Sequence, residues 1–529
     1  MSKNRNASIE FKEPTAPDSE GSVIIRAIKR DARIKPVIIS VFAFSVLAHL
    51  FRYTNSAFNS DSLGIFRGGI DIPKQIGRGR WLQPLYLYVR GPISAPFLIG
   101  LLATVYLALS AILIVKILGI RNRGRIVILC GLLAVAPAIT ITNAAFLPWT
   151  DIFMLSLLFS MISAWFMTLS NVKCRYLIAA VFLVLSLALY QAYIGACMVI
   201  CLFWLLRGCL TGERCRDVIK TAAVMALTFA VGFLLYYGTF KICGLISAAS
   251  SHSYNSVASA TILTGDYHLL HLIKGAYKSV LHYILEPQTL YSAVAGGINV
   301  ILILIAAVFF FLAVKTKDVG RIVISLFLVS LCPLAAFFIY LLYGNVSDLL
   351  TFPVSMLYFG VGVLFELVPQ GADRSFVKGL SKAVFILSSI LIFFNAVYAN
   401  QLYVKKSVEE QETLSLMTRV LYQMEQTEGY VPGETKIALI GSLENSDAVI
   451  EKPGYASGGT IDYEISIVYY KNYRMYLTNI MGYPINLAEQ EEAERIGQEQ
   501  SIREMPAFPY PGYTKMYGDT LVVKLSDDR

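Results

Sequence analysis

Long runs of apolar residues are the feature of this chain that most constrains its fold. Of its 529 residues, 56% are hydrophobic, and the mean hydropathy is +0.59. Several runs reach the roughly 20 residues that an α-helix needs to cross a hydrocarbon core about 30 Å thick. Backbone polar groups inside that core must pair within the protein, so such runs predict helices. The composition excludes an ordinary soluble protein and predicts a polytopic α-helical membrane protein.

Eleven transmembrane helices are expected, and the chain between them alternates in charge. The helices are predicted near residues 37–52, 94–118, 126–142, 150–169, 176–190, 191–206, 221–241, 296–314, 321–343, 349–368 and 381–398. Five connections are basic: 121–125, 172–175, 207–220, 315–321 and 373–382. Because Lys and Arg accumulate in cytoplasmic loops, these connections and the N-terminus are predicted to be cytoplasmic. The net charge of +9 is explained mainly by these loops, and no nucleic-acid partner is expected.

Residues 176–206 allow two interpretations. They form either one long tilted helix or two short helices that meet near Tyr190 and Gln191. A single crossing would move the basic connection 207–220 to the outside, against the rule for cytoplasmic loops. We therefore expect two helices, which makes the number of crossings odd.

The chain is expected to contain three parts. Residues 1–35 are a cytoplasmic tail with a basic interfacial helix at 22–35, and residues 36–400 form the transmembrane domain. Two large outside loops interrupt that domain at 53–93 and 242–295. Residues 401–529 are less hydrophobic and are expected to form an α/β domain on the outer face. In that domain we predict helices at 407–427 and 486–500 and strands at 436–443, 464–470 and 519–525.

The first outside loop contains more cations than a short outside loop normally does. Arg67, Lys74, Arg78, Arg80 and Arg90 all lie in it. Because Arg binds phosphate oxygens through two parallel hydrogen bonds, we predict a lipid-phosphate site with Arg67, Arg78 and Arg80 as its main ligands. The alternative is simple attraction to anionic headgroups.

Two carboxylates are the predicted catalytic groups. Asp61 follows the first span near the bilayer surface, where a carboxylate can accept the proton of a sugar hydroxyl. Helix N-capping by the Ser- and Asn-rich segment around it is the alternative. Asp151 lies at the outer end of a span after Pro148 and Trp149, where acids are frequently functional, and helix N-capping is the alternative. Trp81 is a candidate for stacking on a sugar, with an interfacial anchor as the alternative.

The second outside loop contains a predicted amphipathic helix at 266–287. Lys274 and Lys278 share one face with histidines, whereas leucines cover the other, which suits a membrane surface. Both lysines are weaker candidates for holding a lipid phosphate. His268 and His271 are too little to predict a metal, so no metal site is expected. The cytoplasmic loops are too short for a nucleotide-sugar domain, and no phosphate-binding glycine motif occurs.

Three short motifs together resemble one enzyme family. They are the Asn59-x-Asp61 loop, the Gly79-Arg80-Trp81 sequence and the step at Tyr190-Gln191 between two short helices. These motifs resemble the phage-type O-antigen glucosyltransferases, the Gtr serotype-converting family of GT-C glycosyltransferases. The tail, with Phe508-Pro509 and a late strand at 522–525, is similar in outline. Many members have two adjacent acids in the first loop, and here only Asp61 matches that position.

The resemblance implies a GT-C fold and a specific reaction. The donor would be a sugar, usually glucose, on undecaprenyl phosphate, and the acceptor a lipid-linked O-antigen or related glycan. Transfer would occur on the periplasmic face of a bacterial inner membrane. Asn59, Trp81, Tyr190 and Gln191 would bind sugar or acceptor. Two alternatives are a lipid-glycan flippase or transporter, for which repeated halves and mid-span charges are expected, and an O-antigen polymerase.

Overall fold

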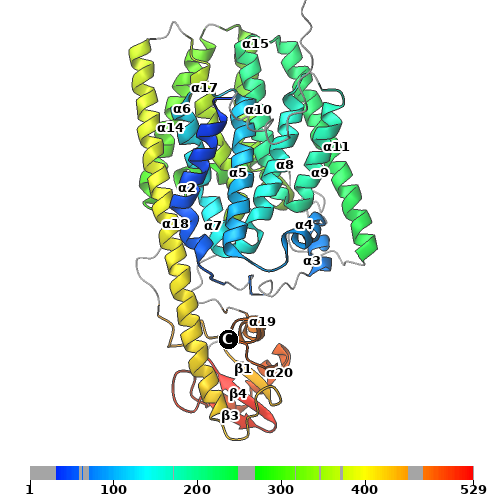
Figure 1. Ribbon diagram of the computed structural model, residues 1–529, viewed down its shortest axis with the longest axis vertical. Coiled ribbons are helices and arrows are strands. Elements are labelled where there is room, and N and C mark those ends of the chain that lie inside the picture. Colours follow the sequence, from blue (N-terminus) through cyan, green and yellow to red (C-terminus); the bar gives the residue numbers. More distant parts are fainter. Residues whose placement is uncertain are drawn as a thin grey trace, which may run out of the picture.

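The computed structural model describes residues 31–527 except 59–61, 64–70, 171, 248–268, 316, 345–346, 370–372, 451–466 and 468. Three predicted site residues, Asn59, Asp61 and Arg67, lie outside the described residues, as does most of the interfacial helix expected at 22–35. The described chain forms a long helical bundle with a smaller α/β tail at one end (Figure 1). We call the bundle end that faces the tail the tail end, and the opposite end the basic end.

Every predicted transmembrane segment has a helical counterpart in the bundle. These are α2 (Ile34–Thr54), α5 (Pro96–Leu118), α6 (Arg123–Ala134) with α7 (Pro137–Phe146), α8 (Thr150–Thr168), α9 (Arg175–Leu189), α10 (Ile194–Thr211), α11 (Cys215–Ser247), α14 (Ser292–Val314), α15 (Val319–Ala336) with α16 (Phe338–Tyr343), the 3-10 turns η4 (Asp348–Leu350) and η5 (Phe352–Met356) with α17 (Leu357–Glu366), and α18 (Arg374–Glu425). By length and composition, nine stretches among the described residues are able to cross a membrane. One of them, Arg123–Thr168, contains two predicted spans, and Arg175–Leu189 is a shorter apolar helix in addition. The chain is thus a polytopic membrane protein.

The helix break expected near Tyr190 is present. Tyr190 is extended, with φ −162° and ψ 118°, and the short 3-10 turn η2 (Gln191–Tyr193) follows before α10 begins. Breaking a helix leaves carbonyls without helical partners, which must bond elsewhere when buried. Two serine hydroxyls of α8 donate hydrogen bonds to carbonyls at the break. Ser156 donates to the Tyr190 carbonyl at 2.9 Å, and Ser160 donates to the Tyr193 carbonyl at 3.2 Å. The prediction of two helices over 176–206 is confirmed.

Contacts between distant segments gather the basic connections at one end of the bundle. The guanidinium of Arg207, on α10, lies against Gly119, which ends α5 with φ +66°. The Arg321 guanidinium, at the start of α15, donates to the carbonyls of Cys209 and Gly212. The start of α6 and the end of α17 meet in a 2.6 Å ion pair between Arg125 and Glu366. Several of the basic connections recognised in the sequence therefore meet at the same end of the bundle.

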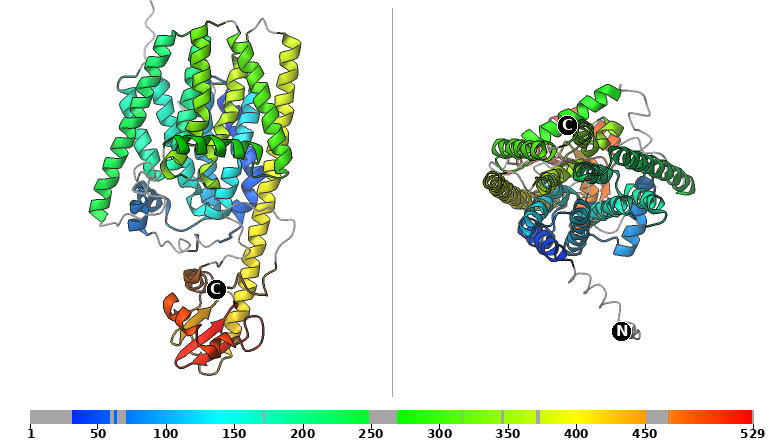
Figure 2. Two further views of the ribbon diagram at one scale, coloured as in Figure 1. Left: turned by 180° about the vertical axis from the view of Figure 1, so that it is seen from behind. Right: turned by 90° about the horizontal axis from the view of Figure 1, so that it is seen from above.

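A short amphipathic helix lies across the bundle. It is α13 (Leu269–Leu285), and Figure 2 shows it running crosswise to the long helices. Leu272, Ala276 and Val280 are buried, and the helix packs on α14, α15 and α16. Its orientation and its exposed leucines match the amphipathic helix predicted for the second outside loop.

One helix connects the bundle to the tail. The sequence predicts a span at 381–398 and a separate helix at 407–427, but α18 is continuous over 52 residues (Figure 1). No Gly or Pro interrupts residues 399–406. Instead, Lys405 and Lys406 contact Glu409 at 3.7 and 2.7 Å, at the spacings that stabilise a helix. The loss of hydrophobicity after residue 399 marks the end of the apolar span and not the end of the helix.

The tail contains a mixed four-stranded sheet. Its strands are β1 (Lys436–Ile440), β2 (Asn486–Leu487), β3 (Thr514–Tyr517) and β4 (Thr520–Lys524), in the order β2-β1-β4-β3. β1 is parallel to β2 and β4, whereas β3 and β4 form an antiparallel hairpin. Short helices surround the sheet: α19 (Tyr470–Met475), its extension η7 (Tyr476–Ile480), α20 (Gln490–Ile496) and α21 (Gln500–Arg503). The strands expected at 436–443 and 519–525 are confirmed; most of the strand expected at 464–470 lies outside the described residues, and its last residue begins α19.

The first outside loop is attached to the tail. Leu63 is fully buried in the hydrophobic core that the tail forms with the end of α18. The Asn479 side chain, on η7, donates to the Leu63 carbonyl at 3.2 Å. Before the loop, the Phe58 amide donates to Glu410 on α18, and Tyr476 donates to the other oxygen of that carboxylate. Residues on both sides of Asp61 are therefore held at the junction between bundle and tail.

Candidate functional site

Two short helices position the cations of the first outside loop. They are α3 (Ile72–Gly77) and α4 (Leu82–Arg90), which lie at the tail end of the bundle (Figure 1). Asp71 caps α3 by accepting a 2.9 Å hydrogen bond from the Lys74 amide, and Pro73 is in its first turn. α3 packs on α11, and α4 packs on α9. The turn between them, residues 78–81, is called the Arg-Trp turn below.

A hydrogen-bonded latch joins the Arg-Trp turn to the helix break at Tyr190. The Gln191 amide nitrogen donates to the Arg78 carbonyl at 3.0 Å and to the Tyr236 hydroxyl at 2.8 Å. That hydroxyl in turn donates to the Gly79 carbonyl at 3.0 Å. The Gln191 amide thus uses both of its N–H groups, and three segments far apart in the sequence meet at one point.

Gly79 is required by this latch. Its φ is +79°, and a Cβ placed on it would lie 2.2 Å from the Tyr236 hydroxyl oxygen. A side chain here would be strained and would also clash. The groups that approach the Gly79 backbone are the side chains of Tyr236 and Gln191.

The two side chains at the end of the turn have unused hydrogen-bond donors. The Arg80 guanidinium lies 4.9 Å from the ring centroid of Tyr190, which is itself stacked on Phe153 at 3.9 Å. Within the described residues Arg80 has no ion pair, and neither its Nε nor the Trp81 Nε1 has an acceptor. A cation held on an aromatic face beside unused donors is suited to an anion such as phosphate. The structure thus brings Arg80, predicted as a phosphate ligand, next to Tyr190 and Gln191, predicted with Trp81 as sugar or acceptor ligands.

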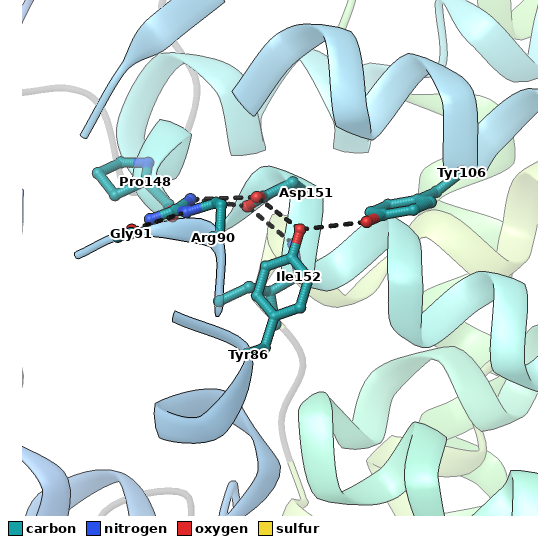
Figure 3. Close-up of polar contacts among 7 residues, drawn as sticks. All are labelled: Tyr86, Arg90, Gly91, Tyr106, Pro148, Asp151 and Ile152. Atoms are coloured by element: carbon teal, nitrogen blue, oxygen red, sulfur yellow. Dashed lines mark hydrogen bonds and ion pairs between the residues drawn. The ribbon is translucent and has the colours of Figure 1, made fainter. Parts of the chain in front are cut away.

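Asp151 is the centre of a second, buried cluster. It begins α8, and Figure 3 shows Arg90 and Tyr86 of α4 converging on its carboxylate. Arg90 Nη1 lies 3.0 and 3.1 Å from the two carboxylate oxygens, and the Tyr86 hydroxyl donates to one of them at 2.9 Å. The Ile152 amide donates to the other oxygen at 3.0 Å. Both oxygens of Asp151 are thus engaged.

The same cluster fastens α4 to the bundle. Arg90 Nη1 also donates to the Pro148 carbonyl at 3.0 Å, and Tyr86 approaches Tyr106 of α5. Burial and the adjacent Asp151 carboxylate raise the pKa of Tyr86 above its usual range, so its hydroxyl remains a donor at neutral pH. The chemistry that this cluster provides is a fixed attachment for α4, next to the Arg-Trp turn.

The two lysines of the second outside loop lie apart from these clusters. Lys274 and Lys278 are both exposed on α13, which packs on α14, α15 and α16. In the part of the chain that the structure describes, no three His, Cys, Asp or Glu side chains form a group that could hold a metal ion.

Sequence reasoning missed three residues of the site. These residues do not stand out in the sequence, because they lie within apolar or amphipathic helices: Tyr236, Tyr86 and Gln83. Gln83 donates to the Leu189 carbonyl at 2.7 Å and so satisfies a carbonyl directly before the helix break at Tyr190. The one signal in the sequence was a polar side chain within an apolar run, and such a side chain does not reveal which distant residue it will bond.

Comparison with known proteins gives one match. A family model described as "Glucosyl transferase GtrII" matches residues 50–365, which is more than half of the chain. The matched range contains the Arg-Trp turn, the helix break and Asp151, and it ends before α18 and the tail. No curated protein and no solved structure matches the chain.

Proposed function

Because the chain belongs to the glucosyl transferase GtrII family, we propose that it transfers single glucose units from a polyprenyl phosphate to a lipid-linked glycan. The family supports a membrane glucosyltransferase and disfavours a flippase or transporter. A bacterial inner membrane, with an O-antigen or related glycan as the acceptor, completes the proposal. A GT-C arrangement with eleven crossings would put the tail and the tail end of the bundle on the periplasmic face.

The single observation that carries the lipid-linked donor is the environment of Arg80. Its guanidinium stacks on Tyr190 without an ion pair among the described residues, whereas Arg90 is neutralised by Asp151. In the proposed reaction, the acceptor oxygen bonds to the anomeric carbon while the bond from that carbon to phosphate breaks. The phosphate then gains one negative charge, which a preorganised cation stabilises. Arg78 and Arg67 are proposed to assist, with Lys274 and Lys278 in weaker supporting roles.

Asp61 is the proposed base. It would take the proton of the acceptor hydroxyl as that oxygen attacks. Support comes from its neighbours in the sequence: Phe58 and Leu63 are both held at the junction of α18 and the tail. Asn59, Trp81 and Gln191 are proposed to contact the sugars.

Asp151 is proposed to act as a positioning residue. Its carboxylate already accepts hydrogen bonds from Arg90, Tyr86 and Ile152. It would therefore act through α4, by holding the Arg-Trp turn in place. No divalent metal is required by this scheme, because arginine supplies the positive charge.

The test is a reconstituted transfer assay. Purified protein in nanodiscs is given a bacterial lipid-linked glycan and either undecaprenyl-phosphate glucose or UDP-glucose, and addition of one hexose is followed by mass spectrometry. We expect transfer from the lipid donor alone. Transfer from UDP-glucose in protein freed of carrier lipid would contradict the proposed donor, and joining of whole repeat units would indicate a polymerase.

A further inference from the structure

The tail contains a cavity that the proposed reaction does not use. It has a volume of about 570 Å³, within the roughly 300–1,000 Å³ usual for small-molecule sites. It lies beyond the carboxyl ends of the parallel strands β1 and β4, between α19 and the α20–α21 segment. Crevices at this edge of parallel strands are the usual place for ligands in α/β folds.

The floor of the cavity is rigid. Gly441 follows β1 with φ +75°, and a Cβ on it would lie 2.3 to 2.8 Å from atoms of Ser526. The Ser442 amide donates to the Ser526 hydroxyl at 2.9 Å. The Lys524 ammonium, buried at the end of β4, donates to the carbonyls of Arg503 and Met505 at 2.7 Å each. The ends of the two strands are thus fixed to each other and to α21.

The charges that line the cavity balance. Lys524 is paired with Asp527 at 2.7 Å. Of the remaining lining residues, Arg503 is exposed and has no ion pair among the described residues, and Glu494 accepts a hydrogen bond from Gln490 at 3.0 Å. A phosphate would need a surplus of cations. One guanidinium, one carboxylate and one amide instead offer donors and acceptors to a neutral ligand with many hydroxyls.

Tyrosines form one wall. Tyr469, Tyr470 and Tyr473 line the cavity, and Tyr469 is 49% exposed. Tyr470 and Tyr473 are held in place, because their hydroxyls pair with the Ala488 carbonyl and the Leu443 amide. Aromatic rings beside placed polar groups suit a ligand with both an apolar face and polar edges. A pyranose ring has this combination.

The cavity is also close to the first outside loop. Its tyrosines lie at the start of the helical segment formed by α19 and η7, and Asn479 near the end of that segment contacts Leu63. From Tyr473 to Asn479 an α-helical rise spans roughly 9 Å. Figure 1 shows α19 on the side of the tail that faces the bundle. A glycan of a few sugars would reach from the cavity to Leu63, which follows Asp61 by two residues in the sequence.

We propose that this cavity binds neutral sugar residues of the acceptor glycan, away from the sugar that receives glucose. The inference rests on the proposed function for the source of those sugars, but sugar binding itself does not. Tyr469 would pack on a ring face, while Arg503 and Glu494 bind hydroxyls. The tail would thereby select the acceptor.

Binding is measured on the full-length protein in nanodiscs by biolayer interferometry. The probe is the soluble polysaccharide released by mild acid from the lipopolysaccharide of the bacterium in which the protein occurs naturally. Tyr469→Ala and Arg503→Ala should each raise the Kd about tenfold or more, which is the usual effect of losing one good contact. Tyr422→Ala and Arg495→Ala remove exposed side chains of the same types outside the cavity and should change it less than about twofold.

Measurements of transfer kinetics test the cavity proposal and the proposed glucosyltransferase function separately. The two cavity variants should raise KM for the acceptor and leave KM for the donor unchanged. If wild-type protein transfers glucose but the cavity variants bind polysaccharide normally, the cavity proposal is overturned and the function stands. If the variants lose binding and the wild-type protein transfers nothing from the lipid donor, the sugar site stands and the function fails. Absence of polysaccharide binding by wild-type protein also overturns the proposal.

Discussion

Arg90 reaches both carboxylate oxygens of Asp151, at 3.0 and 3.1 Å, and the two side chains are 2% and 0% exposed. This pair links the end of α4 to the start of α8. It also separates the cations of the first outside loop into two kinds. Arg90 has a permanent counter-ion and a structural task, whereas Arg80 stacks on Tyr190 without an ion pair in the described chain.

Breaking the buried pair should destabilise the protein. Asp151→Asn leaves the Arg90 charge buried without a counter-ion, and Arg90→Gln leaves the Asp151 charge in the same state. Each variant should lower the free energy of unfolding by about 3–5 kcal/mol. The double variant should lose clearly less than the sum, because no lone charge remains. Thermal unfolding in one detergent checks this, and additive losses would show that the two charges do not depend on each other.

Arg80→Gln should impair use of the lipid-linked donor. Loss of one charge-assisted contact to phosphate is worth roughly 1.5–3 kcal/mol, or about 10- to 150-fold in kcat/KM. Arg80→Lys should recover only part of this, since lysine lacks the planar fork. Lys278→Gln, which removes an exposed cation from α13, is the matched control and should have a smaller effect. Equal, small losses in both would favour general attraction to headgroups.

Asp61→Asn should abolish transfer while donor binding remains. The side chain keeps its shape and loses its basicity, and general bases typically contribute 10²- to 10⁴-fold. Turnover with the lipid donor and equilibrium binding of that donor are measured on the same preparation. Near-normal turnover would remove Asp61 from the mechanism.

Gly79→Ala should disrupt the latch through a clash with Tyr236. The control is Gly91→Ala: Gly91 also has a positive φ, +95°, but a Cβ there meets nothing within 4 Å. The Gly91→Ala control therefore introduces only backbone strain, about 1–3 kcal/mol, whereas Gly79→Ala adds the steric conflict with Tyr236. Combining Gly79→Ala with Tyr236→Phe removes the clashing oxygen and should recover part of the activity. Identical effects of the two single alanine variants would argue against the latch.

Thiol labelling tests the orientation of the chain. Cys174 is a native exposed cysteine at the basic end, and Gln498→Cys introduces one on the exposed surface of the tail. An impermeant maleimide should label the introduced cysteine in intact spheroplasts, and Cys174 only after permeabilisation, with sites resolved by mass spectrometry. The reverse pattern would place the tail in the cytoplasm and overturn the proposed topology.

Several elements were predictable because their signals are local. Apolar runs, basic connections and the alternation of residues 519–525 depend on neighbours in the sequence. The break at Tyr190 was predicted from the charge of the connection that follows. One crossing over residues 176–206 would leave Arg207 at the opposite end of the bundle, whereas two crossings bring it back to the basic end. The continuity of α18 was missed, since a drop in hydrophobicity ends a membrane span without ending a helix.

Local patterns in the sequence establish that this chain crosses a membrane many times, which of its connections are basic, and that its first outside loop is rich in cations. Which of those cations is neutralised depends instead on how the helices pack in three dimensions. Arg80 and Arg90 are alike in sequence, but their counter-charges come from packing: α4 brings Arg90 to Asp151 and leaves Arg80 on Tyr190. The latch likewise joins Gly79, Gln191 and Tyr236 across more than 150 residues of chain. Long-range contacts of this kind depend on how helices pack, and no local pattern specifies them.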